Sequence, residues 1–143
     1  MKRAQLLEVA GCGADRFETL RHRRALPFET QCEEGRQATY SPRDAFALRL
    51  FLAGTEVGLD QGAARFLANR ASRMFDFEAT HDQWAILLFL KPGPQEGWRA
   101  VKVARLSASP EAILKYHNEG GIHSFVAINA SREWRRVQAR VAA

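Results

Sequence analysis

The chain begins with two short runs whose hydrophobic residues recur at helical spacing. The apolar positions of residues 6–10 predict an amphipathic helix, which the glycines of residues 11–13 should end. Phe17 and Leu20 lie three apart and predict the buried face of a second helix, with Asp15 as its N-cap. The side chains left on the other face of this helix are Arg16, Thr19, His22 and Arg23. This pattern is typical of a helix-turn-helix, and a helical hairpin with solvated arginines is the alternative.

A small hairpin is predicted after the second helix. Pro27 should end that helix, because the residue before a proline is pushed out of the helical region. Residues 29–40 are polar, and the alternation of Arg36, Ala38 and Tyr40 predicts a return strand. A hairpin in this place would be a wing, with Arg36 at its tip to contact a phosphate.

Two longer helices follow in the pattern. Residues 41–44, Ser-Pro-Arg-Asp, open a helix with Ser41 as N-cap, and its apolar residues almost encircle the axis, which predicts a central core helix. Gly54 or Gly58 should end it. A further helix is predicted from residues 59–61 to about Arg73.

The second half changes to strand-like patterns. Residues 84–90 and 98–106 predict two strands of a hairpin, joined by a turn rich in proline and glycine. A helix opening at Ser109, a third strand over residues 122–128 and a last helix capped by Asn129 or Ser131 complete a ββαβα order. In the last helix we expect inward positions at Trp134, Val137 and Val141, and outward ones at Arg132, Arg135, Arg136 and Arg140. That basic row could be a solvated face, a partner surface or a second DNA contact. The three tryptophans are expected to anchor the core of this half.

The predicted fold class is therefore α+β. A winged helix-turn-helix, mostly α with a β-hairpin wing, would occupy residues 1–73, and a small ββαβα module for dimerisation or partner binding would occupy residues 74–143.

Composition adds charge to this picture. Of the 143 residues, 46% are hydrophobic and 26% are charged, which is ordinary for a globular protein. The net charge of +5 favours an anionic partner. The basic residues are mostly arginine, whose planar fork suits phosphate and guanine. Neither a signal peptide nor a membrane span is expected, and with only Cys12 and Cys32 we expect a reduced, cytoplasmic protein associated with the nucleoid.

The first half resembles the winged helix-turn-helix domain of MerR-type regulators and the related phage excisionase-like domains. The residues that carry the resemblance are 6–11, 19–21, Leu26-Pro27 and 35–44, together with the step at Val57-Gly58-Leu59. The resemblance implies that Arg16 and Thr19 face the major groove, that Arg21 and Arg36 grip phosphates, and that Tyr40 anchors the wing or touches the DNA backbone. His22-Arg23 stand where an aromatic pair is usual, and the long dimerisation helix of MerR regulators is missing. The phage-like domains are therefore as close a match.

The predicted function is a sequence-specific, double-stranded DNA-binding transcription regulator that acts as a homodimer. The expected DNA contacts are Arg16, Thr19, Arg21, His22, Arg23, Arg24, Arg36, Tyr40 and Arg43. Glu18 is expected to pair with Arg21 or His22, or else to accept from cytosine. An excisionase-like architectural factor, or a docking module that recruits a partner such as RNA polymerase, is the alternative.

No chemistry beyond binding is expected. The histidines and cysteines lack metal-site spacing, and we expect no cofactor and no metal. Asp76, Glu78, His81 and Asp82 could suggest acid–base catalysis, but they also fit a hydrated linker. With no phosphate-binding loop and no nucleophile motif, we do not expect an enzyme.

Overall fold

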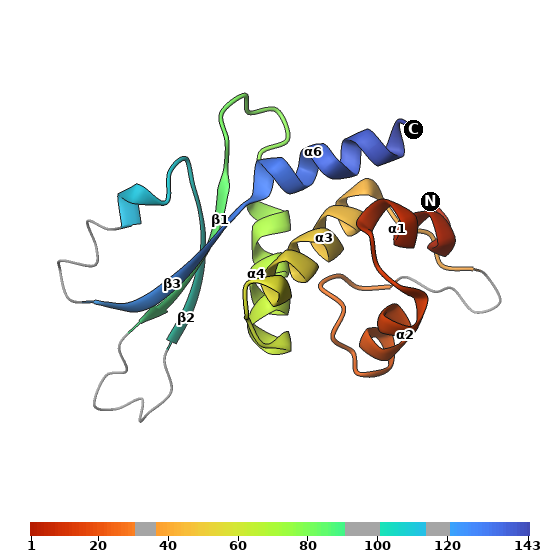
Figure 1. Ribbon diagram of the computed structural model, residues 1–143, viewed down its shortest axis with the longest axis horizontal. Coiled ribbons are helices and arrows are strands. Elements are labelled where there is room, and N and C mark those ends of the chain that lie inside the picture. The colour runs from red at the N-terminus through yellow and green to blue at the C-terminus, as the bar shows by residue number, and fades with distance from the viewer. Residues whose placement is uncertain (31–36, 91–100, 114–120) are drawn as a thin grey trace.

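The structure is a computed structural model that describes residues 1–30, 37–90, 101–113 and 121–143. Its architecture is α+β, as the sequence predicts, with a three-stranded antiparallel sheet on one side and helices on the other (Figure 1). Helix α4 lies between the sheet and the remaining helices. The two ends of the chain lie near one another at the helical end of the molecule.

The first two helices are joined by a glycine turn, as predicted. Helix α1 (Arg3–Ala10) ends at Gly11, which has a φ of 69° and whose amide donates to the carbonyl of Glu8. Helix α2 (Ala14–His22) already contains Asp15, so the prediction of this residue as its N-cap is wrong. The N-cap is Gly13, two residues before the predicted one, and the carboxylate of Asp15 lies in the first turn, where it interacts favourably with the helix dipole instead.

Helix α3 (Pro42–Glu56) is the central core helix that the sequence predicts. The hydroxyl of Ser41 accepts the amide of Asp44 at 3.2 Å, and the carboxylate of Asp44 accepts the amide of Ser41 at 2.8 Å, a complete capping box. Every residue from 45 to 54 is buried. Gly54 does not end the helix: a Cβ there would lie 3.2 Å from that of Ala64, so glycine permits close packing on α4.

Helix α4 (Gln61–Met74) occupies the predicted range. The carboxylate of Asp60 caps it by accepting the amide of Ala63 at 2.7 Å. Its buried face is made mainly of small side chains, namely Ala63, Ala64, Ala68, Ala71 and Ser72, with Leu67 among them. These small residues allow α3 on one side and strands on the other to approach closely.

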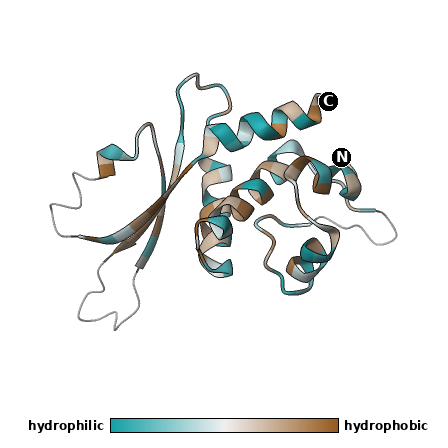
Figure 2. Ribbon diagram, viewed as in Figure 1, coloured by the Kyte–Doolittle hydropathy of each residue, from teal (hydrophilic) through white to brown (hydrophobic). Residues whose placement is uncertain are grey.

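The sheet is built from β1 (Trp84–Leu90), β2 (Val101–Ser107) and β3 (Ile122–Asn129), in the order β2-β1-β3. All three strands were predicted near these positions, and residues 111–113 are helical, as expected after Ser109. Leu87 lies opposite Ala104 and Val126 on the face that packs on the helices. Figure 2 shows the apolar character of these strands.

Helix α6 (Ala130–Val141) follows β3 directly and crosses over α3 toward α1 (Figure 1). Its N-cap is Asn129, one of the two predicted residues, whose side chain accepts the amide of Arg132 at 3.0 Å. Val137 is fully buried, whereas the predicted inward residue Val141 is 39% exposed. The main core contains residues of α1, α2, α3 and α4 together with residues of β1, β3 and α6, so both predicted halves share it.

The prediction of a return strand for the wing is wrong over residues 37–40, the part of that segment that the structure describes. Residues 37–40 have no strand pairing, because the amide of Tyr40 donates to the carbonyl of Met1 at 2.8 Å and the carbonyl of Tyr40 accepts from the Met1 nitrogen. Arg36, at the predicted tip, lies outside the described residues, as do Cys32 and Trp98. Among the helices of the described ranges, none is both long and apolar enough to cross a membrane.

Candidate nucleic-acid interface

The exposed side of α2 carries the side chains that the sequence assigns to DNA. Phe17 and Leu20 are buried against the core, as predicted. The predicted contact residues of this helix and its C-terminal turn are all exposed, namely Arg16, Thr19, Arg21, His22, Arg23 and Arg24. Six polar side chains on and beside one short helix make a surface that a nucleic acid could reach.

Arg16 and Thr19 already have partners in the protein. The guanidinium Nη2 of Arg16 donates to the hydroxyl of Thr55 on α3 at 2.9 Å. The hydroxyl of Thr19 donates to the carbonyl of Asp15, one turn earlier, at 3.0 Å. For Arg16 to contact a base, it must exchange the Thr55 bond for one to DNA.

Glu18 holds several cations on the other flank of α2. Its carboxylate accepts from Nη2 of Arg21 at 2.9 Å and from Nε at 3.2 Å, and it forms an ion pair with Arg3. His22 lies farther away, at 4.0 Å. The hydrogen bond from Arg21, with the nearby positive charges, lowers the pKa of Glu18 from its ordinary value. The predicted pairing with Arg21 is confirmed, and the contribution of Arg3 from α1 was missed.

Two hollows lined by basic residues flank Arg21. One, of about 630 Å³, lies between α1, α2 and the segment before α3, and Lys2 and Arg3 line it together with Arg21. The other, of about 410 Å³, is lined by Arg21, Arg24 and Arg65, with Glu29 as the one acidic residue in its wall. We call Lys2, Arg3, Arg21, Arg24 and Arg65 the α2 basic surface.

The α2 basic surface combines residues from three places in the chain: the start of α1, α2 with its C-terminal turn, and α4. Sequence reasoning missed Lys2, Arg3 and Arg65. Lys2 and Arg3 could have been found as two basic residues at the start of the first helix. Arg65 is brought in by α4, where its Nε donates to the carbonyl of Leu26 at 3.0 Å.

Arg24 has an unusual backbone. Its φ of 52° puts it in the left-handed region, and it is the only non-glycine residue of the described ranges with a positive φ. This is the position after a helix end that glycine usually occupies, and its amide donates to the carbonyl of Arg21 at 3.1 Å. Arg24 therefore places a charged side chain at a position where glycine would avoid the backbone strain.

Tyr40 and Arg43 are the two described residues among the predicted DNA contacts that lie outside α2 and its C-terminal turn. The ring of Tyr40 is 7% exposed and packs edge-on against Phe17 and Phe28, with centroids 6.1 and 6.0 Å apart. This burial fits the anchoring role better than a direct DNA contact. Arg43 is exposed at the start of α3, with its guanidinium 5.1 Å from the ring centroid of Phe77.

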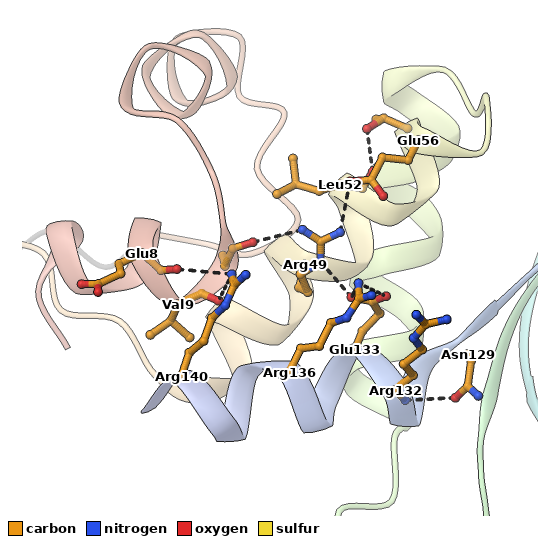
Figure 3. A network of polar contacts seen from close by, with 12 residues as sticks. Glu8, Val9, Arg49, Leu52, Glu56, Asn129, Arg132, Glu133, Arg136 and Arg140 are labelled. Carbon is orange, nitrogen blue, oxygen red and sulfur yellow. Dashed lines mark hydrogen bonds and ion pairs between the residues drawn. The ribbon is translucent and has the colours of Figure 1, made fainter. Parts of the chain in front are cut away.

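A network centred on the buried Arg49 joins α1, which carries part of the α2 basic surface, to α3 and α6 (Figure 3). Arg49 is 8% exposed, and its Nη1 donates to the carbonyl of Ala10 at 3.2 Å, at the end of α1. The same guanidinium binds Glu133 of α6 and Glu56 of α3. Arg140 adds a bond from its Nη1 to the carbonyl of Val9 at 3.1 Å. Two cations therefore lie at the C-terminal end of α1, where the helix dipole favours them.

Most arginines of the predicted basic row of α6 bind other groups of the same chain. All four arginines are exposed, as predicted, but three of them have partners. Arg135 pairs with Asp82 at 2.9 Å, Arg136 pairs with Glu133 at 3.1 Å, and Arg140 binds α1. Their charges are thus less available to a partner than the sequence alone indicates.

The acidic segment before β1 holds the sheet in place. Asp82 accepts from Arg135 and from Asn129, and these hydrogen bonds, that of Arg135 first, lower its pKa. Asp76 exchanges backbone bonds with the side chain of Gln83. Nowhere in the described ranges do three or more His, Cys, Asp or Glu side chains gather as metal ligands would.

Comparison with known proteins adds no relative: no family model matches the chain, and neither does any curated protein.

Proposed function

We propose that this protein binds double-stranded DNA through the exposed side of α2 and the α2 basic surface, as a sequence-specific transcription regulator. The observation that carries the proposal is the convergence of Lys2, Arg3, Arg21, Arg24 and Arg65 around a helix that follows a glycine turn. Clustered cations beside an exposed helix suit a phosphate backbone, because arginine forms charge-assisted bonds to phosphate oxygens.

The contacts divide into two kinds. Arg21, Arg24 and Arg65 would bind phosphates and set the orientation of the helix. Arg16, Thr19, His22 and Arg23 would face base edges, with Arg16 best suited to a guanine because its fork can bond O6 and N7 together. Glu18 holds Arg3 and Arg21 in place before DNA arrives, which lowers the entropic cost of binding.

A homodimer on a pseudo-palindromic site is part of this proposal. One helix of nine residues covers little of a DNA site, and two copies would supply the surface that specific complexes bury. A protein acting in this way would be found on the nucleoid.

The test is a binding titration over a series of salt concentrations, with a duplex selected from a random pool. Arg24→Gln and Arg65→Gln should each weaken binding and flatten the plot of log K against log salt by about one unit, because each removes about one phosphate contact. Arg16→Gln should relax the selected sequence instead.

Lys102→Gln is the matched control, since this exposed cation lies on β2, away from α2. Sedimentation of the protein with and without duplex reports the number of copies bound. Equal affinity and equal salt slope in the wild type and all variants would refute the proposal, as would the absence of any duplex binding at low salt.

A further inference from the structure

The sheet has a second apolar face, directed away from α4. Side chains of β1 alternate, so Leu87 faces the main core while Ile86 and Leu88 face the other side. The residues packed on that other side form a separate cluster, consisting of Ile86, Leu88, Ile113 and Ile122 with Trp84, Leu90, Val103, Phe125 and Ala127 around them. An antiparallel sheet of this kind usually turns a polar face to water. The apolar character of this second face is therefore unusual for such a sheet.

A hollow of about 430 Å³ opens on this face. Its walls include Ile86, Leu88 and Leu90 of the central strand, with Ile113 and Ile122 from the flanking segments. Ile86 is fully buried, and Leu88 is 5% exposed. The volume falls in the range of about 300–1,000 Å³ that is usual for small-molecule sites.

One cation stands at the hollow. Arg105 lies opposite Ile86 in the register of β1 and β2, so its side chain leaves the sheet on the same face. It is exposed, and no carboxylate among the residues that the structure describes pairs with it. The other polar side chain in the wall, Ser107, already donates to the carbonyl of Ser109 at 2.8 Å.

We propose that this hollow binds a small molecule with an apolar body and one carboxylate. The apolar part would lie against Leu88, Leu90 and Ile113, whose side chains line the hollow. The carboxylate would accept hydrogen bonds from the guanidinium of Arg105, which suits the planar carboxylate with two parallel donors. The inference is independent of DNA binding, because residues of the sheet line the hollow, and the sheet and α2 lie at opposite ends of the molecule (Figure 1).

Octanoate and octanol are suitable probes because they share a chain and differ in charge. Titration of the full chain, followed by the methyl resonances of its isoleucines, should show one saturable site for octanoate, with shifts at Ile86, Ile113 and Ile122. Octanol should bind about tenfold more weakly. Arg105→Gln should weaken octanoate about tenfold and leave octanol unchanged.

Two variants control this experiment. Lys102→Gln removes an exposed cation of the same strand on the opposite face and should leave octanoate binding unchanged. Ala112→Trp places a large ring at the exposed rim of the hollow and should block both probes. Equal affinity for octanoate and octanol, equal loss in the Arg105 and Lys102 variants, or the absence of saturable binding would each overturn the proposal.

Discussion

Arg49 and Glu133 are 84 residues apart in the chain and form a buried ion pair, with Nε of the arginine 2.8 Å from Oε2 of the glutamate. Arg49 is 8% exposed and Glu133 is 7% exposed. The pair joins the central helix α3 to the last helix α6. Because the same guanidinium also binds the carbonyl of Ala10, the position of α1 depends on it as well. The glycine turn and α2 follow directly from that point.

Removing one partner of this pair should destabilise the protein strongly. Glu133→Ala leaves Arg49 buried without its main counter-charge, and we expect the free energy of unfolding to fall by about 3–5 kcal/mol. Arg135→Ala, on the exposed side of the same helix, should cost less than about 1 kcal/mol.

Urea denaturation of both variants measures the difference. The double variant Arg49→Met with Glu133→Met should recover much of the loss, because it removes both buried charges. A Glu133→Ala variant no less stable than Arg135→Ala would show that the pair contributes little.

Arg24→Gly should separate stability from binding. Glycine adopts a φ of 52° without steric cost, so the free energy of unfolding should rise by about 0.5–1 kcal/mol. Duplex binding should weaken at the same time, because the guanidinium is lost. Arg23→Gly is the matched control: Arg23 has a φ of −79°, so glycine should destabilise there. Thermal melts and the salt titration above measure the two effects. A loss of stability in Arg24→Gly would contradict the interpretation of its backbone.

Ser41→Ala should remove the cap of the central helix. The amide of Asp44 then loses the hydroxyl of Ser41 and keeps only the carbonyl of the same residue at 3.1 Å, and we expect a loss of about 1 kcal/mol in the free energy of unfolding. The neighbouring Thr39→Ala is the control, since Thr39 is exposed and its hydroxyl has no bond to other residues of the described ranges. Chemical denaturation should distinguish the two, and equal stabilities would argue against the capping box.

Asp82 should make stability depend on acid pH. Its pKa is lowered in the folded protein by the hydrogen bond from Arg135 and then by that from Asn129. The stabilisation that Asp82 contributes is therefore fully present above the pKa of this residue in the unfolded chain, about 4. It is lost as the pH falls through the lower pKa of the residue in the folded protein. The advantage of the wild type over Asp82→Asn should shrink as the pH falls below about 4.

Denaturation midpoints at several pH values measure this difference. Arg135→Gln should reduce this pH dependence, because it removes the largest cause of the lowered pKa and leaves the hydrogen bond from Asn129. A constant difference between wild type and Asp82→Asn at all pH values would exclude the effect.

Local patterns were enough to predict most elements of the fold. The capping box at Ser41 and Asp44, the strand at residues 84–90 and the cap of the last helix at Asn129 all depend on neighbours within a few residues. Two exceptions have different reasons. α2 begins one residue before the predicted cap at Asp15, and the backbone of Tyr40 bonds to Met1, which the pattern of residues 29–40 does not contain.

The candidate interface was predicted only in part. The residues of α2 could be found because helical periodicity separates its buried face from its exposed one. Arg3 and Arg65 reach the same surface from α1 and α4, and nothing in their own neighbourhoods indicates α2. The arginines of α6 were expected to be free, whereas Arg135, Arg136 and Arg140 bind groups of their own chain.

The sequence by itself determined where most helices and strands lie, which faces are apolar, and that the chain is basic, because these depend on residue type and short-range spacing. The tertiary structure decided which charges remain available to a partner. Arg49, inside a helix that is apolar all round, receives its role only when α6 brings Glu133 to it and α1 ends at Ala10. Pairing between distant residues depends on how helices pack, and that geometry is set by the whole core at once.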